Sequence, residues 1–259
     1  MSAETELLDG SPTPPPGLSH FLHSLFSLFF PDTCRVCEEL LERFTLVPVC
    51  RACLDGLRGL PARAGSCEGC GLPLAAAGGP CRQCQQGDYE FEQARSFGAY
   101  DGALREVLHL FKYRGMTPLA APLAARMAEV LKREWAPGRF DALVAVPLAR
   151  GRERERGYNQ AALLARELGR RCGLPVLENV CRRVRATPPQ TGLTRAQRLE
   201  NLRGAFAPGP RAALLAARRV LLIDDVFTTG ATLSACIRVL RQAGAKSVCA
   251  LTVARTLAG

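Results

Sequence analysis

Two adjacent carboxylates at the end of an apolar run are the residues best placed to do chemistry. The aliphatic residues 220–223 lead directly into Asp224 and Asp225. An uninterrupted apolar run is typical of a central parallel strand, and ligands of open α/β sheets bind beyond the carboxyl ends of such strands. We therefore expect both carboxylates to face a ligand and to accept hydrogen bonds from neighbouring hydroxyl groups.

A small, hydroxyl-rich turn follows the carboxylates and opens a predicted helix over 231–243. The turn consists of Thr228, Thr229, Gly230, Ala231 and Thr232. The first N–H groups of a helix have no partner within it and lie at its positive dipole end, which suits a phosphate. Carboxylates and turn together predict a site for a ribose 5-phosphate. The simpler alternative is a solvated Asp pair before an ordinary turn.

Eight of the twelve cysteines fall between positions 34 and 84, in four Cys-x-x-Cys pairs. The pairs are Cys34/Cys37, Cys50/Cys53, Cys67/Cys70 and Cys81/Cys84. Two such pairs complete a tetrahedral four-cysteine site, so eight ligands predict two closed, structural zinc ions in a double zinc ribbon. We favour sequential sharing, 34/37 with 50/53 and 67/70 with 81/84, over a crossed arrangement.

A disulfide framework and a redox dithiol are the alternative interpretations of these cysteines. Disulfides need an oxidising compartment, and the apolar residues 18–30 lack the basic leader and cleavage site of a signal peptide. Four repeated pairs do not look like one reactive dithiol. We therefore expect a cytoplasmic protein that holds zinc. The other cysteines are expected to be small core residues: Cys172, Cys181, Cys236 and Cys249.

Charge is distributed unevenly along the chain. Residues 1–94 carry 6 Lys and Arg against 12 Asp and Glu, whereas residues 95–259 carry 28 against 12. A positive second part suits a pyrophosphate or nucleic-acid ligand. The alternative is that heavy arginine use reflects genome composition.

The pattern predicts a disordered tail over 1–17, an amphipathic helix over 18–30, a double zinc ribbon over 31–88 and a second domain over 89–259. Residues 18–30 are too few to span a bilayer as a helix, so we expect no stable membrane insertion. Docking of that helix on a membrane surface is the alternative.

The second domain alternates apolar strands with helices, which predicts an α/β fold with a parallel, doubly wound sheet. Expected strands are 89–100, 140–146, 175–180, 219–225 and 246–254, and expected helices are 102–112, 118–134, 157–171 and 231–243. The Arg/Gly/Glu run at 150–157 is expected to be a loop. His109 is expected to pack within its helix.

Residues 220–232, VLLIDDVFTTGAT, resemble the phosphoribosyl pyrophosphate (PRPP) signature of type I phosphoribosyltransferases. The resemblance implies that Asp224 and Asp225 hold the ribose hydroxyls and also serve catalysis. It implies that Val226 and the 228–232 turn complete the PRPP site, with Mg2+ bound alongside PRPP.

More of the chain, roughly residues 20–256, is similar to the competence ComF family, which carries this fold behind paired N-terminal cysteines. The matching segments are Lys112–Gly115, 144–168 with Arg156–Asn159, 182–201 and Val253–Thr256. The resemblance implies PRPP contacts from Lys112, Leu148, Ala149 and Arg150 and a catalytic role for Arg156. Many relatives carry His where this chain has Ala149, so no side-chain role is carried over there.

The same resemblance implies a link to competence and nucleotide metabolism. Its implied partners are single-stranded DNA and a competence helicase or other uptake machinery. Candidate DNA contacts are the basic residues Arg182, Arg183 and Arg185, with exposed aromatic rings expected at Tyr113, Tyr158 and Phe227. The leading hypothesis is a Mg2+-dependent phosphoribosyltransferase of unnamed acceptor. The alternatives are a non-catalytic PRPP-fold protein that binds DNA or regulates, and a zinc scaffold that binds no PRPP.

Overall fold

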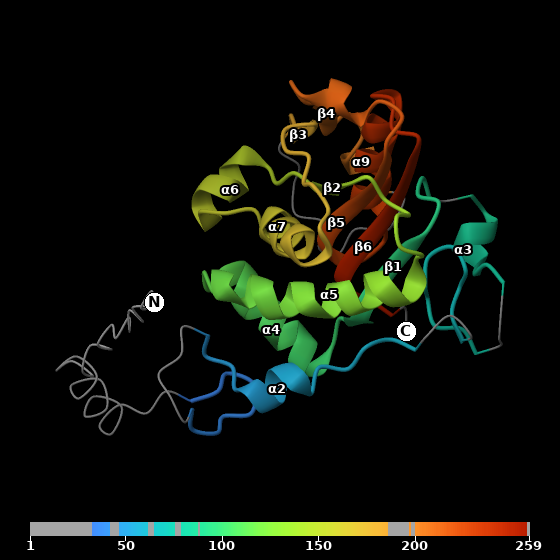
Figure 1. Ribbon diagram of the computed structural model, residues 1–259. Coiled ribbons are helices and arrows are strands. Elements are labelled where there is room, and N and C mark those ends of the chain that lie inside the picture. Colours follow the sequence, from blue (N-terminus) through green and yellow to red (C-terminus); the bar gives the residue numbers. More distant parts are fainter. Residues whose placement is uncertain are drawn as a thin grey trace, which may run out of the picture. The chain divides into compact units, whose positions relative to one another are not determined.

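A computed structural model describes residues 33–41, 47–61, 65–75, 79–87, 89–185, 197 and 200–257 (Figure 1). The expected tail over 1–17 and helix over 18–30 lie outside the described residues. The chain divides into two compact units, residues 1–50 and residues 51–259, and each is described by itself.

In the first unit, a tight turn carries the first Cys-x-x-Cys pair. An isolated antiparallel bridge joins Thr33 to Leu40. Within it, the N–H of Cys34 donates to Glu39 O at 2.8 Å, and the N–H of Glu38 donates to Cys34 O at 2.8 Å. Glu38 has φ 63°, the left-handed conformation that lets the chain turn back after the pair.

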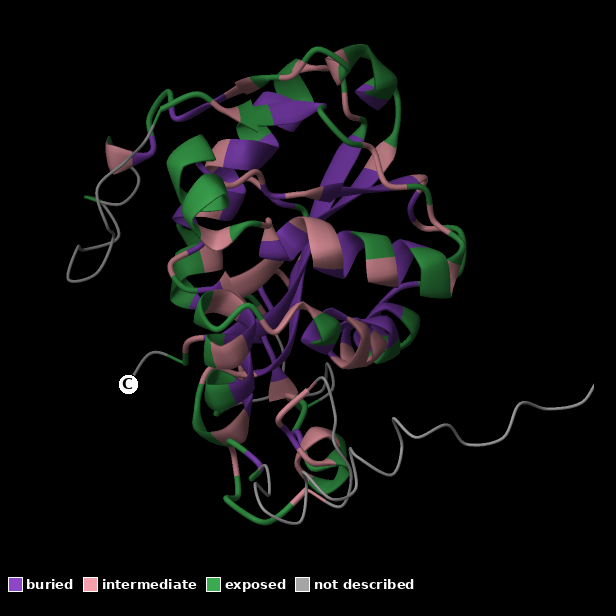
Figure 2. Ribbon diagram, turned by 90° about the vertical axis from the view of Figure 1, so that its left-hand side faces the viewer, coloured by how far each residue is buried: buried purple, intermediate pink, exposed green. Residues whose placement is uncertain are grey.

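A four-stranded parallel sheet forms the centre of the second unit (Figure 1). Its strands, in spatial order, are β1 (Ala94–Ala99), β6 (Ser247–Arg255), β5 (Arg219–Phe227) and β2 (Ala142–Ala145). Figure 2 shows the strands of the sheet mostly as buried ribbons, whereas the helices around them combine buried, half-buried and exposed residues. Parallel strands covered on both faces need apolar side chains on both sides, which accounts for the uninterrupted run at 220–223.

Helices cover both faces of this sheet. The longer helices are α4 (Gly102–Tyr113), α5 (Ala120–Glu134), α7 (Gln160–Cys172) and α9 (Ala231–Gln242). Val220 and Leu222 of β5 share one buried cluster with Leu233 and Ile237 of α9. Because side chains alternate along a strand, the residues between them point to the opposite face, where α5 and α7 contact the sheet.

Shorter elements complete the unit: α2 (Arg51–Asp55), α3 (Arg82–Gln85), α6 (Arg150–Arg156), and the 3-10 turns Thr117–Leu119 and Ala212–Leu215. β3 (Cys181–Arg183) and β4 (Phe206–Pro208) form a separate antiparallel pair. Among the described residues, no helix combines the length and the apolar character needed to cross a membrane.

The predicted parallel α/β fold is confirmed, and all four predicted helices are present with bounds shifted by a few residues. The predicted strand at 175–180 is wrong. Only a bridge between Leu143 and Val176 forms there. Asn179 then adopts φ 60°, which ends the extended segment before β3 begins.

Candidate functional site

The two carboxylates lie inside β5 rather than beyond it, because this strand runs on to Phe227. β2 pairs with β5 only as far as Ala145 opposite Ile223. On the other side, β6 stays paired with β5 up to Arg255 opposite Phe227. Asp224 and Asp225 therefore occupy the first positions of β5 that have lost a neighbouring strand on the β2 side.

Asp225 forms an ion pair with Lys112 at the end of α4. The Nζ atom lies 3.0 Å from Asp225 Oδ1, and the two side chains are 15% and 14% exposed. Burial lowers the pKa of Lys112, but the charges of Asp225 and Asp224 raise it, and the net shift is upward. Lys112 therefore carries its positive charge at the strand end throughout the neutral range.

Asp224 behaves differently from its neighbour. Burial, followed by repulsion from Asp225, raises the pKa of Asp224 to about 7. The N–H of Asp225 donates to Asp224 Oδ1 at 2.8 Å and opposes the rise, as do the charges of Lys112 and Arg183. A carboxyl group whose pKa is raised toward neutral pH at the carboxyl end of a parallel strand is typical of a functional site.

Arg183 of β3 adds positive charge to this site, and the sequence pointed to it both as a DNA contact and as a cation for pyrophosphate. It is half-buried and its guanidinium lies 5.4 Å from the Phe206 ring. Burial lowers its pKa, and the charge of Asp224 raises it. The β3–β4 pair thus brings a cation to the Asp224 side of β5. No spacing in the sequence relates positions 183 and 224.

The hydroxyl-rich turn connects β5 to α9 at the same end of the sheet. Gly230 has φ 74° and stands at the N-cap of α9, where the N–H of Ser234 donates to Gly230 O at 2.9 Å. Ala231 is buried, Thr229 and Thr232 are half-buried, and Thr228 is exposed. The free N–H groups of a helix start are therefore placed one turn beyond the carboxylates.

The end of α4 also contacts Arg156 and Tyr158, which follow one another closely in the chain. The Tyr158 hydroxyl donates to Phe111 O, and the Arg156 guanidinium lies 5.0 Å from the Tyr113 ring. Since Lys112 reaches Asp225 from the same helical turn, the structure brings together three segments that are far apart in the sequence.

The run expected to be a loop is a short helix, α6. The N–H of Glu153 donates to Ala149 O at 2.9 Å, and Gly157 ends the helix with φ 81°. Leu148 and Ala149 connect β2 to this helix, so Arg150 stands at its start and Arg156 at its end. The two arginines therefore do not share one phosphate-facing loop.

A cavity of about 280 Å³ opens where β2 gives way to α6. Leu148 and Arg150 line it, together with Arg182 and Arg183 from β3. Four arginines (Arg150, Arg166, Arg182 and Arg183) and two glutamates (Glu153 and Glu178) line this cavity, which opens at the same end of the sheet as Asp224.

The exposure of four aromatic and histidine side chains, those of Phe227, Tyr158, Tyr113 and His109, agrees with expectation only at Tyr113. Phe227 is 1% exposed and Tyr158 is half-buried, so neither ring is free to stack on a base. Tyr113 is 60% exposed, as expected. His109 is exposed on α4, against the Tyr113 ring, rather than packed.

The eight paired cysteines gather into two clusters of four. In the sets Cys34/Cys37/Cys50/Cys53 and Cys67/Cys70/Cys81/Cys84, all sulfur atoms lie within 4.8 Å of one another. All twelve cysteines are described, and none forms a disulfide. The sequential sharing of pairs is therefore confirmed, and the crossed arrangement is wrong.

The geometry of both clusters fits zinc. Cys37 and Cys50 sulfurs lie 3.7 Å apart, as do those of Cys70 and Cys81. Tetrahedral zinc with Zn–S near 2.3 Å places its sulfurs about 3.8 Å apart. Backbone N–H groups also point at sulfur, with Cys81 N–H donating to Cys67 Sγ at 3.2 Å. Such donors stabilise thiolates, the form that binds metal.

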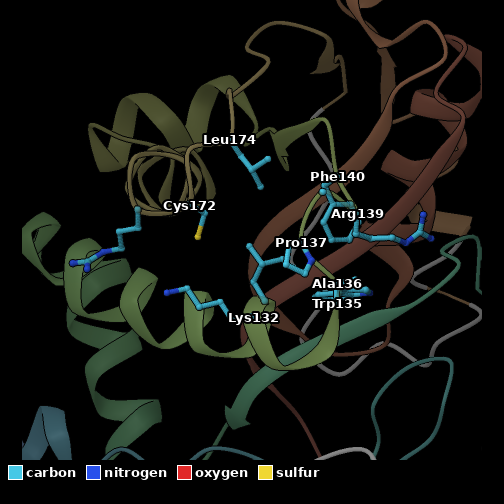
Figure 3. A pocket seen from close by; sticks show the side chains of 11 residues that line it. Lys132, Trp135, Ala136, Pro137, Arg139, Phe140, Cys172 and Leu174 are labelled. Carbon is cyan, nitrogen blue, oxygen red and sulfur yellow. The ribbon is translucent and has the colours of Figure 1, made fainter.

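A larger cavity, of about 380 Å³, lies at the opposite end of the sheet (Figure 3). The residues that line it include Trp135, Phe140, Leu174, Lys132 and Cys172. Burial raises the pKa of Cys172, which keeps it a thiol. Cys172 is half-buried, whereas Cys181, Cys236 and Cys249 are core residues as expected. This cavity lies before β2 begins, and none of the residues that line it is a carboxylate.

Comparison with known proteins agrees with this geometry. Residues 117–259 match the family model described as "Phosphoribosyl transferase domain". The chain is 32% identical to the DNA utilization protein YhgH of Salmonella typhimurium, over 89% of this chain and 100% of that protein. It is 30% identical to competence protein F of Haemophilus influenzae, over 77% and 87% of the two chains. It is 28% identical to competence protein ComFC of Bacillus subtilis, over 86% and 95%.

Proposed function

The chain belongs to the ComF family of phosphoribosyltransferase-fold proteins, and from that premise we propose that it binds PRPP with Mg2+ at the carboxyl end of β5. The single observation that carries the proposal is that the Lys112–Asp225 ion pair and the 228–232 turn lie together at the carboxyl end of β5. Carboxylates, a fixed cation and a helix start are the groups that a phosphorylated ribose requires.

In this proposal each part of the site has its own task. Asp224 and Asp225 accept hydrogen bonds from the ribose hydroxyls. Val226 continues the strand that carries them. The backbone N–H groups of Thr228, Thr229, Gly230, Ala231 and Thr232 bind the 5-phosphate.

The diphosphate is assigned to the opening between β2 and α6. We assign contacts with it to the backbone of Leu148 and Ala149 and to the side chain of Arg150, because Leu148 and Arg150 line a cavity rich in arginine and Ala149 lies between them in the chain. Arg183 adds positive charge from β3, and Arg156 does so from the end of α6.

The carboxylates of Asp224 and Asp225 fit Mg2+, which proteins usually bind through one or two carboxylates together with the phosphates of the ligand. When bound, Mg2+ neutralises the charge that develops on a departing diphosphate. The protein's own contribution is to hold the ribose, to hold both ends of the ligand, and to keep Lys112 ionised beside Asp225. None of the chain's three histidines, at positions 20, 23 and 109, follows β2 or β5. Positioning and charge therefore take the place of a histidine base.

Calorimetry of the full chain with PRPP and Mg2+, followed by pyrophosphate release with a panel of nucleobases, tests this function. Binding with release supports a phosphoribosyltransferase. Binding without release for any base supports a non-catalytic PRPP-fold protein. Absence of PRPP binding refutes the assignment and leaves the zinc-scaffold hypothesis.

A role in handling single-stranded DNA within the cytoplasm, alongside the uptake machinery, is the second proposal. It is supported by the printed names of the relatives, which refer to competence and DNA utilization. Arg182 is exposed beside the ligand cavity, whereas Arg185 is occupied by the carbonyls of Asn201 and Arg203. Arg182 is therefore the better contact of the two.

Salt dependence separates this proposal from specific base recognition. Binding of an oligonucleotide that relies on phosphate contacts weakens steeply between low and moderate salt. Fluorescence anisotropy of wild type and Arg182→Ala at two salt concentrations is the measurement. Equal affinity of the two proteins at low salt would remove Arg182 from the contact.

A further inference from the structure

Three aromatic rings stand behind the turn that opens α9. Tyr89 stacks on Phe91 with ring centroids 4.7 Å apart, and Phe227 meets both rings edge-on at 5.7 and 5.9 Å. A Cβ atom added to Gly230 would lie 2.6 Å from the Tyr89 ring and 2.7 Å from the Phe227 ring. The rings therefore leave room only for a residue without a side chain at position 230. They also limit how far the turn can shift toward Tyr89 and Phe227.

The same rings are attached to the second cysteine cluster, Cys67/Cys70/Cys81/Cys84. The Tyr89 hydroxyl donates to Gln83 Oε1 at 2.7 Å, and Gln83 lies in α3 between two of the cysteines. Cys67, Cys70 and Cys81 share one buried cluster with Phe91 and Phe227. The cysteine cluster is thus part of the core that supports the turn.

Arg255, the last residue of β6, makes a second connection. It is 3% exposed, and its Nη1 donates to Cys70 O. Its guanidinium lies 4.8 Å from the Phe227 ring. The next residue returns to the turn itself, since Thr256 N–H donates to Phe227 O at 2.9 Å and its hydroxyl to Thr228 O at 3.4 Å.

Arg95 of β1 holds the first half of the cluster against the sheet. It is 4% exposed and donates to Glu68 O at 3.0 Å and to Gly69 O at 3.2 Å, while its Nε pairs with Glu134 at 2.9 Å. A buried guanidinium needs such partners to remain in the core. Three of the four backbone carbonyls that Arg95 and Arg255 contact therefore belong to the 67–70 segment, and the fourth is Ala94 O, 2.8 Å from Arg95 Nη1.

From these contacts we propose that the second cluster, when it holds zinc, sets the conformation of the 228–232 turn. Tyr89, Phe227 and Arg255 are the positioning residues that connect the two. Zinc fixes the 67–70 and 81–84 segments, as four-cysteine sites do in small modules. Loss of the metal frees the carbonyl that Arg255 uses and the helix that Tyr89 contacts, so the turn loses its support.

The expected effect on PRPP binding rests on the proposed function, which assigns the 5-phosphate to the 228–232 turn. Release of zinc from this cluster weakens PRPP binding without any change in Asp224 or Asp225. The first cluster, Cys34/Cys37/Cys50/Cys53, supplies a matched comparison, since none of its residues takes part in these contacts.

Hydrogen exchange of the turn, measured by mass spectrometry on the full chain without ligand, tests the connection independently of PRPP. Cys84→Ser should lose one zinc per chain and speed exchange of residues 228–234 several-fold. Cys37→Ser should also lose one zinc, and its exchange in 228–234 should match that of wild type. Equal exchange in both variants, whether fast or slow, overturns the proposal.

Substitutions that leave all eight cysteines in place decide the matter if Cys84→Ser does not fold. Tyr89→Leu removes the ring behind Gly230 and should speed exchange in 228–234 at full zinc content. Tyr89→Phe keeps the ring but loses the hydroxyl that donates to Gln83, so its exchange should lie between that of wild type and that of Tyr89→Leu. Aromatic pairs contribute roughly 0.5–1.5 kcal/mol, which corresponds to about two- to tenfold in an equilibrium constant. Unchanged exchange in Tyr89→Leu also overturns the proposal.

Calorimetry with PRPP and Mg2+ on the same proteins separates the two levels of inference. Weaker PRPP binding by Tyr89→Leu, in step with faster exchange, supports both. If neither wild type nor any variant binds PRPP, the proposed ligand is refuted. Faster exchange in Tyr89→Leu and Cys84→Ser would then still support the connection between zinc and the turn.

Discussion

The ammonium group of Lys112 lies 3.0 Å from a carboxylate oxygen of Asp225, and this contact joins the last turn of α4 to the end of β5. Arg156 and Tyr158 contact the same turn of α4 through Tyr113 and Phe111. One helix end therefore connects the strand that carries the carboxylates with the segment that follows α6. A substitution of Lys112 should therefore alter the structure both at the end of β5 and in the segment that follows α6.

Replacement of both carboxylates tests the ribose site. Asp224→Asn with Asp225→Asn keeps the shape of both side chains but removes their charge. Hydrogen bonds to charged groups contribute about 1.5–3 kcal/mol each, so PRPP affinity in calorimetry should fall at least tenfold. Asp101→Asn, an exposed residue before α4, is the matched control. Unchanged affinity in the double variant would sink the ribose assignment.

Lys112→Met should destabilise the fold as well as weaken the ligand site. The substitution leaves Asp225 charged and mostly buried with its cation removed, and breaking such a pair costs about 3 kcal/mol. Chemical denaturation of wild type and variant measures this loss. Lys246→Met changes an exposed lysine and should leave the free energy of unfolding within about 0.5 kcal/mol of wild type. A Lys112→Met protein as stable as the control would contradict the role given to the pair.

Stability should depend on pH through Asp224. Its pKa is raised from 3.8 to about 7 by burial and by Asp225, so the folded state favours the protonated form. The contribution of Asp224 is therefore complete below about pH 4 and is lost as pH rises through about 7. Thermal unfolding of wild type minus Asp224→Asn should show this decline between pH 5 and 8 without ligand. A constant difference across that range would show that Asp224 titrates normally.

Much of this fold and part of the site could be predicted because the signals are local. The apolar run at 220–223, the carboxylates after it and the Cys-x-x-Cys spacing are all contained in short windows. α6 could also have been predicted. Arg and Glu are good helix formers, and Gly157 takes the left-handed position that ends many helices.

Other features depend on contacts between distant segments, which no window contains. The sequence predicts an exposed Phe227 ring just after a strand. The ring is instead buried, because β5 continues to pair with β6 up to this residue and because Tyr89 and Phe91 pack against it. The approach of Arg183 to Asp224 requires the β3–β4 pair, whose strands are three residues each and carry no alternating pattern long enough to detect. The ion pair between Lys112 and Asp225 could not be predicted either, because only the family resemblance, and no local pattern, pointed to Lys112.

Gly230→Ala should damage the phosphate turn while leaving the sheet intact. The residue needs φ near 74°, and a methyl group there would press on Tyr89 and Phe227. Strain and overpacking of this kind together cost about 1–3 kcal/mol. We expect a lower midpoint of thermal unfolding and at least tenfold weaker PRPP binding. Gly151→Ala is the control, because nothing lies within 4 Å of a Cβ atom at that position in α6. Equal PRPP affinity for Gly230→Ala and the control would remove the turn from the binding site.

Metal analysis should find about two zinc ions per chain, because each of the two clusters presents four sulfurs within 4.8 Å. Protein purified without chelator is the sample, and inductively coupled plasma mass spectrometry is the measurement. Cys37→Ser and Cys70→Ser should each reduce the content to about one, whereas Cys249→Ser, in the core of β6, should leave it at two. A strong chelator should remove both ions and raise hydrogen exchange in residues 65–87, while β5 and β6 remain protected by their ladder. Retention of two zinc ions by the Cys70→Ser protein, or disulfides among the eight paired cysteines, would overturn the assignment of both clusters.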